Sequence, residues 1–319
     1  MKKFIKKIII FIIILSLIIS IPYIIILALP PVYSSSYTAA IIDKYERLKS
    51  IDEPKIIMIA GSNYSFGIDS ETIEEAFGMP VVNMGLHISY GMETVFSYVK
   101  NTINEGDIII LGLEYDVSME GVSGLMCNSI ENNLELLSMV PVNMYLQTAN
   151  DYLHYGKDKI KILSTEGERI YQGLYSRAAF NQYGDIGYSC ENNKMENGYL
   201  ADSKILITPN DSLVEMINSV NKLNNYIRKK GAYMYYSFPS VNELSLEDES
   251  NIPTYLDFLK NNLKVPIISE ISDYIFESKY FYDTNYHLND EGTRLRTQLL
   301  IRDMKEGIPL LKNNYSSSK

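Results

Sequence analysis

The sequence predicts an α/β fold: a three-layer α/β/α domain carried on one N-terminal transmembrane helix. Three observations lead to this prediction. The chain begins with a charge-free apolar run that is long enough to cross a membrane. Short apolar segments then alternate with longer segments of helical periodicity, which indicates a parallel sheet buried on both faces. Polar residues follow the apolar segments directly, where the carboxyl ends of parallel strands usually form ligand sites.

The N-terminal region, residues 1–30, differs in composition from the rest of the chain. Four lysines in "MKKFIKK" precede an uncharged run from Ile8 to Leu29. Roughly 20 apolar residues cross a bilayer. The run is longer than the apolar part of a signal peptide, and no small-residue cleavage site follows it. A retained anchor is therefore favoured over a cleaved signal peptide. Lysines before the span predict a cytoplasmic N-terminus and a single pass through the cell membrane, with the remaining chain extracytoplasmic.

Residues 31–53 are expected to be a short polar linker and a lead-in helix over "AIIDKYERLKS", and residues 54–319 the α/β domain. Three apolar segments without alternation are predicted to be its first strands: "PKIIMIAGS", "PVVNMG" and "GDIIILGLEY". A helix is expected over "DSETIEEAFG", where Asp69 or Ser70 can cap the start and Gly78 the end. Another is expected over "YGMETVFSYVKNTI".

The same pattern resumes in the last third of the chain. Helices are predicted over "DSLVEMINSVNKLNNYIRKKG", "IPTYLDFLKNNL" and "NDEGTRLRTQLLIRDMKE", and strands over "AYMYYSFPSVN" and "VPIISE". Asn289 is expected to cap the final helix, which has two acids in its first turn. Residues from about 120 to 210 lack this regularity. They are expected to form an irregular insertion over the carboxyl edge of the sheet.

Charge and composition argue against several classes of partner and cofactor. The formal net charge is −10, and the chain after the anchor is more acidic still because the four N-terminal lysines precede it. It contains no basic run, which argues against a nucleic-acid partner. Its acids are scattered without the spacing of metal ligands, so no metal or other cofactor is expected. Two cysteines, Cys127 and Cys190, can pair outside the cytoplasm or stay free.

Ser62 and His287 are the candidate nucleophile and base. Ser62 directly follows Gly61 at the end of the first predicted strand, and His287, one of three histidines, follows the last predicted strand by a loop. A serine hydroxyl becomes a good nucleophile only when a base takes its proton. Asp283, four residues before His287, can orient the imidazole and stabilise its charged form. A turn or helix-capping role for Ser62 is the structural alternative.

Other side chains at the predicted edge and in the insertion are candidates for binding a substrate. Arginine, aromatic and amide groups suit sugars or carboxylates, and they suit an ordinary polar loop equally well. His154 is expected on the surface. The candidate substrate-binding residues are Asn63, His87, Glu114, Arg177, Asn181 and Tyr183.

Together these residues resemble the SGNH, or GDSL, hydrolase superfamily, from about residue 54 to 305 with the middle insertion unmatched. The matching features are Ser62 in "GSN", Gly85 in "NMG" and the Asp–His pair before the final helix. The resemblance implies a parallel, flavodoxin-like sheet with Ser62 as nucleophile, His287 as base and Asp283 as its acidic partner. It also implies an oxyanion hole that uses the backbone N–H groups of Ser62 and Gly85.

The sequence departs from the family pattern in two places. The family's last motif has the acid three residues before the histidine, whereas four separate them here, so Asn285 is a second candidate for orienting the base. The family's third motif contains an asparagine where "GLEYD" has Glu114, and an ionised carboxylate cannot donate a hydrogen bond. Asn83, Asn63 or a residue of the insertion is therefore expected to complete the oxyanion hole.

The resemblance implies a serine acyl-ester enzyme on the outer face of the membrane. Anchored, exported members of the superfamily are implicated in alginate-type O-acetylation and in D-alanyl transfer to teichoic acid. The expected reaction is O-acyl transfer, such as acetyl transfer, to or from a cell-surface polysaccharide through a Ser62 acyl-enzyme. A multispanning membrane protein is the expected acyl donor. The alternatives are a carbohydrate esterase of the same mechanism and a catalytically silent scaffold in a polysaccharide or teichoic acid modification complex.

Overall fold

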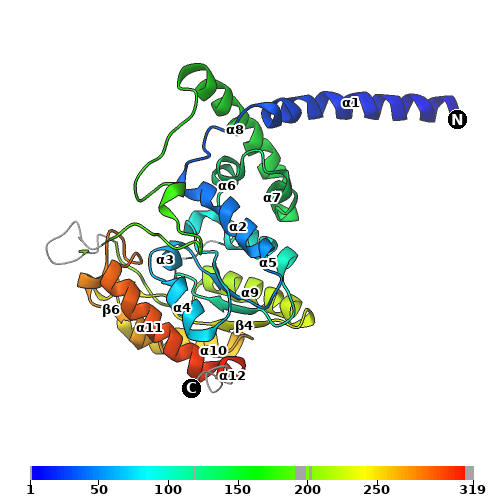
Figure 1. Cartoon of the computed structure of the whole chain (residues 1–319). Helices are drawn as coiled ribbons and strands as arrows, with labels where there is room; N and C mark the ends of the chain where they lie inside the picture. The colour runs from blue at the N-terminus through cyan, green and yellow to red at the C-terminus, as the bar shows by residue number, and fades with distance from the viewer. Residues whose placement is uncertain (1, 116, 118, 191–198, 201–202, 313–319) are drawn as a thin grey trace.

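The computed structural model describes residues 2–115, 117, 119–190, 199–200 and 203–312. It shows an α/β protein with a four-stranded parallel sheet and a long N-terminal helix that projects from the body (Figure 1). The strands are hydrogen-bonded in the order β2-β1-β3-β4. Their bounds are β1 Ile56–Ile59, β2 Val81–Asn83, β3 Ile108–Leu111 and β4 Tyr233–Tyr236.

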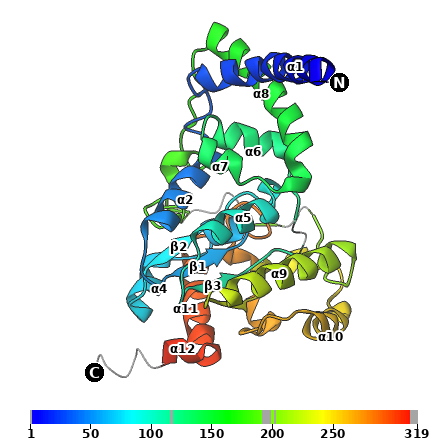
Figure 2. The same ribbon diagram turned by 90° about the vertical axis from the view of Figure 1, so that its right-hand side faces the viewer.

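Helices cover both faces of this sheet. Successive residues of a strand point to opposite faces. Accordingly, Ile57 joins an apolar cluster with α2, α5 and α9, and Ile56 joins a second cluster with α4 and α11. Figure 2 shows α5 and α9 side by side. The helix bounds are α2 Ala40–Ser50, α4 Ser70–Phe77, α5 Met92–Thr102, α9 Asp211–Lys229 and α11 Asp290–Gly307. Burial on both faces explains why the strands lack an alternation of apolar and polar residues.

The predicted helix ends are confirmed where the sequence offered a capping residue. Asp69 caps α4, accepting the N–H of Thr72 at 3.1 Å, and Gly78 ends this helix in the left-handed region at φ 63°. Asn289 caps α11, accepting the N–H of Gly292 at 3.0 Å. The lead-in helix is α2, and "IPTYLDFLKNNL" forms α10, Ile252–Asn262.

The prediction of a strand over "VPIISE" is wrong in extent. This segment contributes a single parallel bridge, between Ile267 and Tyr236. Pro266 has no N–H to donate to a ladder, which limits pairing at this end. A separate small sheet instead pairs β5, Val241–Asn242, with β6, Ile275–Phe276, in parallel.

The prediction of an irregular insertion from about 120 to 210 is wrong for its first half. That half contains α6 Ser123–Ile130, α7 Leu134–Ser138 and α8 Tyr145–Thr165. These helices form a layer between the N-terminal helix and the sheet (Figures 1 and 2). The sequence pattern is obscured because α8 buries Thr148, Gly156 and Lys159 together with its apolar residues.

The N-terminal helix α1, Lys2–Ala28, is long and apolar enough to cross a membrane. Its last turns contact α8. Ile26 packs so closely against Gly156 that a Cβ on the glycine would overlap its side chain. Lys159 donates its ammonium group to the Ile26 carbonyl at 3.2 Å, which satisfies one of the carbonyls left unpaired at a helix end. The helix therefore meets the body through a close-packed contact.

The segment directly after α1 is packed into the protein, so the prediction of a polar linker is wrong for these residues. Val32 and Tyr33 are buried. Their N–H groups donate to the carboxylate of Glu131, each at 2.8 Å. Because Glu131 supplies the acceptors that this irregular backbone lacks, the segment needs no regular secondary structure to be buried.

The same segment pairs with the chain that follows α8. Ser36 forms an antiparallel bridge with Ser176, and the Arg177 N–H donates to the Ser35 carbonyl at 2.9 Å. We refer to residues 31–37 and 169–177 together as the strap. It connects the end of α1 to the carboxyl edge of the sheet.

Replacing Glu131 by glutamine is expected to destabilise the strap. The Glu131 carboxylate accepts from Val32, Tyr33 and the hydroxyl of Tyr155, whereas an amide keeps one acceptor oxygen. Each buried donor left unpaired costs about 1–3 kcal/mol. The melting temperature of the full chain in detergent should therefore fall by several degrees.

Glu135→Gln is the matched control, because Glu135 is exposed and pairs with Lys49 at the surface. Its melting temperature should stay close to that of the parent. Equal losses in the two variants would show that Glu131 has no special role in the strap.

Candidate active site

The first part of the site is the turn that follows β1. Ser62 begins the short helix α3, Ser62–Ser65. Glu114, which follows β3, accepts the N–H of Gly61 at 3.0 Å and that of Asn63 at 3.2 Å. A Cβ at position 61 would overlap the Glu114 carboxylate, so this approach requires glycine. The buried carboxylate therefore holds the turn on both sides of Ser62.

The second part is a tight loop before α11. The N–H of Tyr282 donates to the His287 carbonyl at 2.8 Å, and the Thr284 hydroxyl accepts the N–H of His287 at 2.9 Å. These bonds fold the loop so that Asp283 lies opposite His287. The extra residue between acid and histidine is thus accommodated within the loop.

Ser62, His287 and Asp283 form one chain of hydrogen bonds. The Nε2 atom of His287 lies 2.8 Å from the Ser62 hydroxyl oxygen, and Nδ1 lies 2.9 Å from a carboxylate oxygen of Asp283. Both distances are those of ordinary hydrogen bonds. In this arrangement an imidazole can take the serine proton while the carboxylate holds its tautomer and stabilises the imidazolium.

Two aromatic residues that were not expected from the sequence contact the imidazole of His287 or the carboxylate of Asp283. The ring of Phe66 stacks on His287 with centroids 3.9 Å apart and planes within 7°. The Tyr175 hydroxyl, from the strap, donates to the second carboxylate oxygen of Asp283 at 2.5 Å. Burial raises the pKa of Tyr175, so its hydroxyl keeps its proton near neutral pH. Phe66 lies four residues after Ser62, a usable helical signal, whereas nothing in the sequence singles out Tyr175.

Ser62 lines a pocket of about 300 Å³. Burial, and to a smaller extent the charge of His287, lowers the pKa of His87, so the His87 ring is neutral near pH 7. Its Nδ1 accepts the Ser89 N–H at 3.1 Å. None of the described residues that line the pocket is a lysine or an arginine. They are Tyr37, Ser62, His87, Ile88, Glu114, Tyr175, Thr284, Tyr286 and His287.

Two of the expected oxyanion donors have other partners in the structure. The Gly85 N–H donates to the side-chain oxygen of Asn83 at 2.8 Å. The Asn83 amide donates to the carbonyl of Tyr64 at 2.9 Å and to Asp185 at 2.8 Å. Both groups therefore brace the interior behind the site. The N–H of Ser62 has no hydrogen-bond partner among the described residues.

Three of the residues proposed for substrate binding have structural partners instead. Asn63 donates its amide to the Gly112 carbonyl at 2.7 Å. Arg177 forms an ion pair with Asp43 at 2.6 Å and so ties the strap to α2. Asn181 accepts three successive N–H groups of its own turn.

Of the remaining candidates, two line the pocket and the others lie elsewhere. Glu114 and His87 line the pocket. Tyr183 is buried with Arg47 over its ring, 4.7 Å from the centroid. Asn285, the second candidate for orienting the base, donates instead to Ser203 at 3.0 Å. His154 is exposed on α8, as expected.

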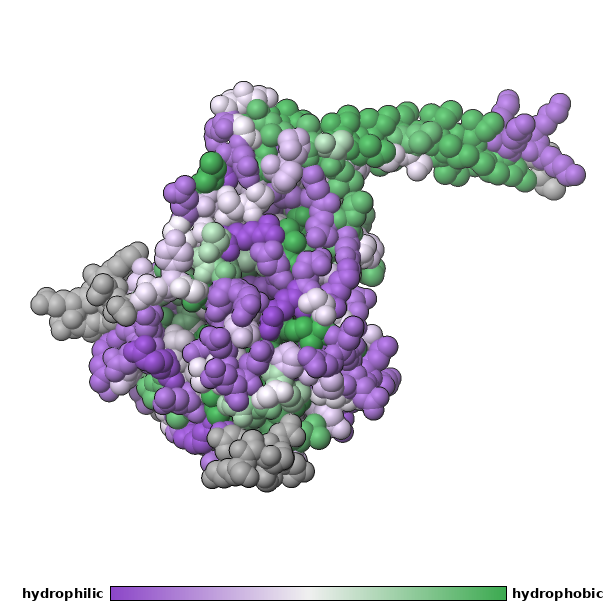
Figure 3. Space-filling view, in the orientation of Figure 1, coloured by the Kyte–Doolittle hydropathy of each residue, from purple (hydrophilic) through white to green (hydrophobic). Residues whose placement is uncertain are grey.

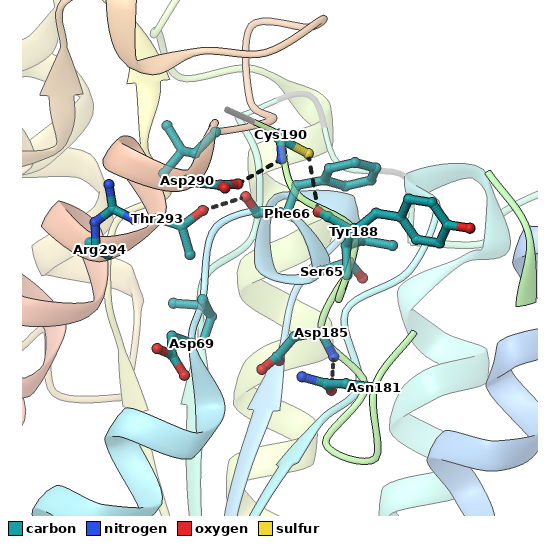
Figure 4. Close-up of a pocket in the computed structure, with 13 residues that line it drawn as sticks. Ser65, Phe66, Asp69, Asn181, Asp185, Tyr188, Cys190, Asp290, Thr293 and Arg294 are labelled. Carbon is teal, nitrogen blue, oxygen red and sulfur yellow. Dashed lines mark hydrogen bonds between the residues drawn. The ribbon is translucent and has the colours of Figure 1, made fainter. Parts of the chain in front are cut away.

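Phe66, whose ring stacks on His287, also lines a second pocket of about 210 Å³. Figure 4 shows this second pocket. Asp290 accepts the Cys190 N–H at 2.7 Å, and the Thr293 hydroxyl donates to the Phe66 carbonyl at 2.9 Å. Asp185, on its other side, accepts from Ser70. These polar groups satisfy one another, so the pocket offers no comparable catalytic arrangement.

Comparison with known proteins identifies no family for this chain: no protein-family model matches it, and no curated protein matches it. Among the residues that the structure describes, no group of three or more histidine, cysteine, aspartate or glutamate side chains is placed to hold a metal ion. The geometry around Ser62 is therefore the basis for a functional interpretation.

The two cysteines are free in the structure, and we expect both to be unreactive thiols in the folded protein. Cys127 and Cys190 are buried, and burial raises the pKa of each thiol to about 12. The thiolate is the reactive form, so a disulfide dye at pH 8 should react slowly with the native chain. Two thiols should titrate at once after denaturation without reductant. No reactive thiol after denaturation would show that the two form a disulfide.

Proposed function

We propose that this chain is a membrane-anchored serine acyl-ester enzyme of the SGNH type, which acts on acyl groups of an extracytoplasmic cell-envelope glycan. The observation that carries the proposal is the hydrogen-bonded chain of Ser62, His287 and Asp283. A capping or turn serine has no need of an imidazole 2.8 Å from its hydroxyl. An oriented histidine and carboxylate are what activation of a serine requires.

The architecture is compatible with this assignment. The strand order β2-β1-β3-β4, followed by a parallel bridge from Ile267 to β4, agrees with a flavodoxin-like arrangement. Ser62 follows β1 and Glu114 follows β3, so both lie at the carboxyl edge, where such sheets bind ligands. We propose on this basis a three-layer SGNH domain.

In the proposed reaction, the Ser62 oxygen attacks the carbonyl carbon of the acyl donor while His287 Nε2 takes the serine proton. Asp283 accepts the Nδ1 hydrogen and stabilises the imidazolium. The Ser62 N–H donates to the developing oxyanion. The C–O bond to the leaving alcohol breaks, and His287 returns the proton to that oxygen. A sugar hydroxyl or water then attacks the acyl-enzyme and gives its proton to His287. The bond between the acyl carbon and the Ser62 oxygen breaks, and His287 returns the proton to that oxygen.

The pocket favours a small acyl group without negative charge. Glu114 contributes the carboxylate in its lining, and none of the described lining residues is basic. Such a site favours an uncharged acetyl or a cationic aminoacyl group over an anionic acyl group. Because acyl-coenzyme A is not present outside the cytoplasm, the donor is expected to be supplied by a multispanning membrane partner.

The orientation follows from the ends of α1. The lysines of its first turns support a cytoplasmic N-terminus by the positive-inside rule, and the body would then lie outside. The acidic net charge of −10 gives no basis for a nucleic-acid partner.

A catalytically silent scaffold is the second candidate, and one observation favours it. The N–H of Gly85 and the amide of Asn83 are bonded inside the protein, and Glu114 stands beside Ser62 where the family has an amide donor. A negative charge there opposes an oxyanion. The scaffold would bind an acylated glycan in the same pocket without cleaving or transferring its acyl group.

Serine reactivity separates the two candidates. The full chain in detergent should be labelled by a fluorophosphonate probe, because His287 activates Ser62. Ser62→Ala should abolish labelling, and His287→Ala should slow it about 10²–10⁴-fold. Ser65→Ala is the matched control, since the Ser65 hydroxyl donates to the Gly85 carbonyl and should leave labelling intact.

If the folded parent protein is not labelled, the enzyme hypothesis is rejected and the scaffold is favoured. If labelling occurs, an acylated chromogenic ester with and without added oligosaccharide distinguishes transfer from hydrolysis. Acylated oligosaccharide indicates a transferase, and free acid alone indicates an esterase.

Tyr175→Phe should slow labelling about tenfold, because the variant loses the hydrogen bond that holds Asp283 in place. Tyr188→Phe is the control, because the Tyr188 side chain is exposed and lines the second pocket. The pair should be compared by labelling rate at several pH values and by melting temperature. A melting temperature that falls in Tyr175→Phe with an unchanged labelling rate would show that Tyr175 is only structural.

A further inference from the structure

The most exposed large hydrophobic side chains of the described chain lie together at the start of α8. Leu146 is 89% exposed and Val142 is 77% exposed, more than the exposed hydrophobic residues of α1 itself. Tyr145 is 47% exposed beside them. These three residues occupy η3, Val142–Met144, and the first turn of α8. Their spacing puts them on neighbouring positions of one helical surface.

The stretch of sequence that carries these residues is uncharged. The segment from Leu136 to Asn150 contains no acidic or basic residue, whereas the later part of α8 contains Lys157, Asp158 and Lys161. An exposed face on a water-soluble surface usually carries charges. A protein interface also has a polar rim around its apolar centre. The absence of charge over this segment favours lipid as the neighbour.

The uncharged end of α8 lies beside the helix proposed as the anchor. The Tyr23 hydroxyl of α1 donates to the Ala149 carbonyl at 3.3 Å, and its ring stacks on Tyr152 with centroids 6.3 Å apart. Tyr145, Ala149 and Tyr152 recur at helical spacing on one side of α8. Tyr145 therefore lies one helical turn before Ala149, on the N-terminal side of the contact with α1. Hydrophobic surface continues from the base of α1 onto the body beneath it (Figure 3).

The depth of this contact follows from the length of α1. From Ile8 to Ala28, at about 1.5 Å per residue, the helix rises about 30 Å, which equals the thickness of the hydrocarbon core. Tyr23 then lies about 8 Å inside the outer end of the span. A side chain that touches Tyr23 therefore lies among the outermost acyl-chain segments, within about 8 Å of the boundary with the headgroups. Tyrosine and aliphatic residues suit this level.

We propose that Val142, Tyr145 and Leu146 form a membrane-contact surface that inserts into the outer lipid interface beside α1. The inference rests on the proposed anchoring of α1. Contact at α1 and at the start of α8 holds the body at two points, which fixes its tilt on the membrane. Because the strap runs from α1 to Tyr37 and Tyr175, the same contacts set the height of the pocket above the lipid.

The chain contains no tryptophan, so a single introduced tryptophan reports its own surroundings. The full-length variants are Leu146→Trp in the proposed surface, Phe11→Trp within the span and Leu310→Trp on α12, Pro309–Lys312, at the opposite end of the molecule (Figure 2). Each is reconstituted in phosphatidylcholine vesicles that contain phosphatidylcholine brominated either near the headgroups or near the bilayer centre. Bromine quenches an indole that it touches.

An indole at Leu146 held about 5–10 Å into the headgroup boundary should lose at least about half of its emission to the shallow bromines and less to the deep ones. Leu310→Trp should not be quenched. Emission at position 146 that is as unquenched as at 310 overturns the inference. A blue-shifted but unquenched indole at 146 also overturns it, because a protein and not lipid then covers the surface.

The Phe11 variant tests the premise separately. Quenching at position 11 by the deep bromines with none at 146 rejects only the contact surface. No quenching at position 11 rejects the anchor itself, and with it the membrane location in the proposed function. The serine labelling of the parent is measured independently of both results.

Discussion

Parallel pairing of the central strands is the constraint on which the site depends. Because β1, β2 and β3 run in the same direction, the segments that follow them emerge at one edge of the sheet. Ser62 and Glu114 leave β1 and β3 there, and the last loop brings His287 to the same edge. Helices on both faces bury the strands, so the register of this edge is held by the core.

Glu114 holds the turn that carries Ser62 in place. Its carboxylate accepts backbone N–H groups on both sides of Ser62, a role that an amide with one oxygen performs less well. The cost is a negative charge next to the position where an oxyanion would form. Glu114 therefore positions the serine but opposes the stabilisation of negative charge beside it, and the two proposed functions differ at this residue.

The strap joins the N-terminal helix to the pocket at Ser62. Its first segment runs from the end of α1 to Tyr37. Its second segment follows α8 and reaches Tyr175, which contacts Asp283. The buried carboxylate of Glu131 and the ion pair of Arg177 with Asp43 hold it to the body. A free linker after α1 would let the body rotate relative to this helix. The strap contacts hold the two together instead.

The sequence by itself determined the strand–helix alternation, the capping residues Asp69 and Asn289, the apolar N-terminal helix and the pairing of Ser62 with His287. These features depend on local periodicity or on strands that end at a common edge. Tertiary structure alone decided that α8 is a helix, that Tyr175 reaches Asp283 and that Gly85 and Asn83 have internal partners. The reason is physical. Small and polar residues, among them Gly156 and Lys159, occupy buried positions of α8 and hide its apolar period. A hydrogen bond between residues 108 positions apart leaves no periodic trace in the sequence.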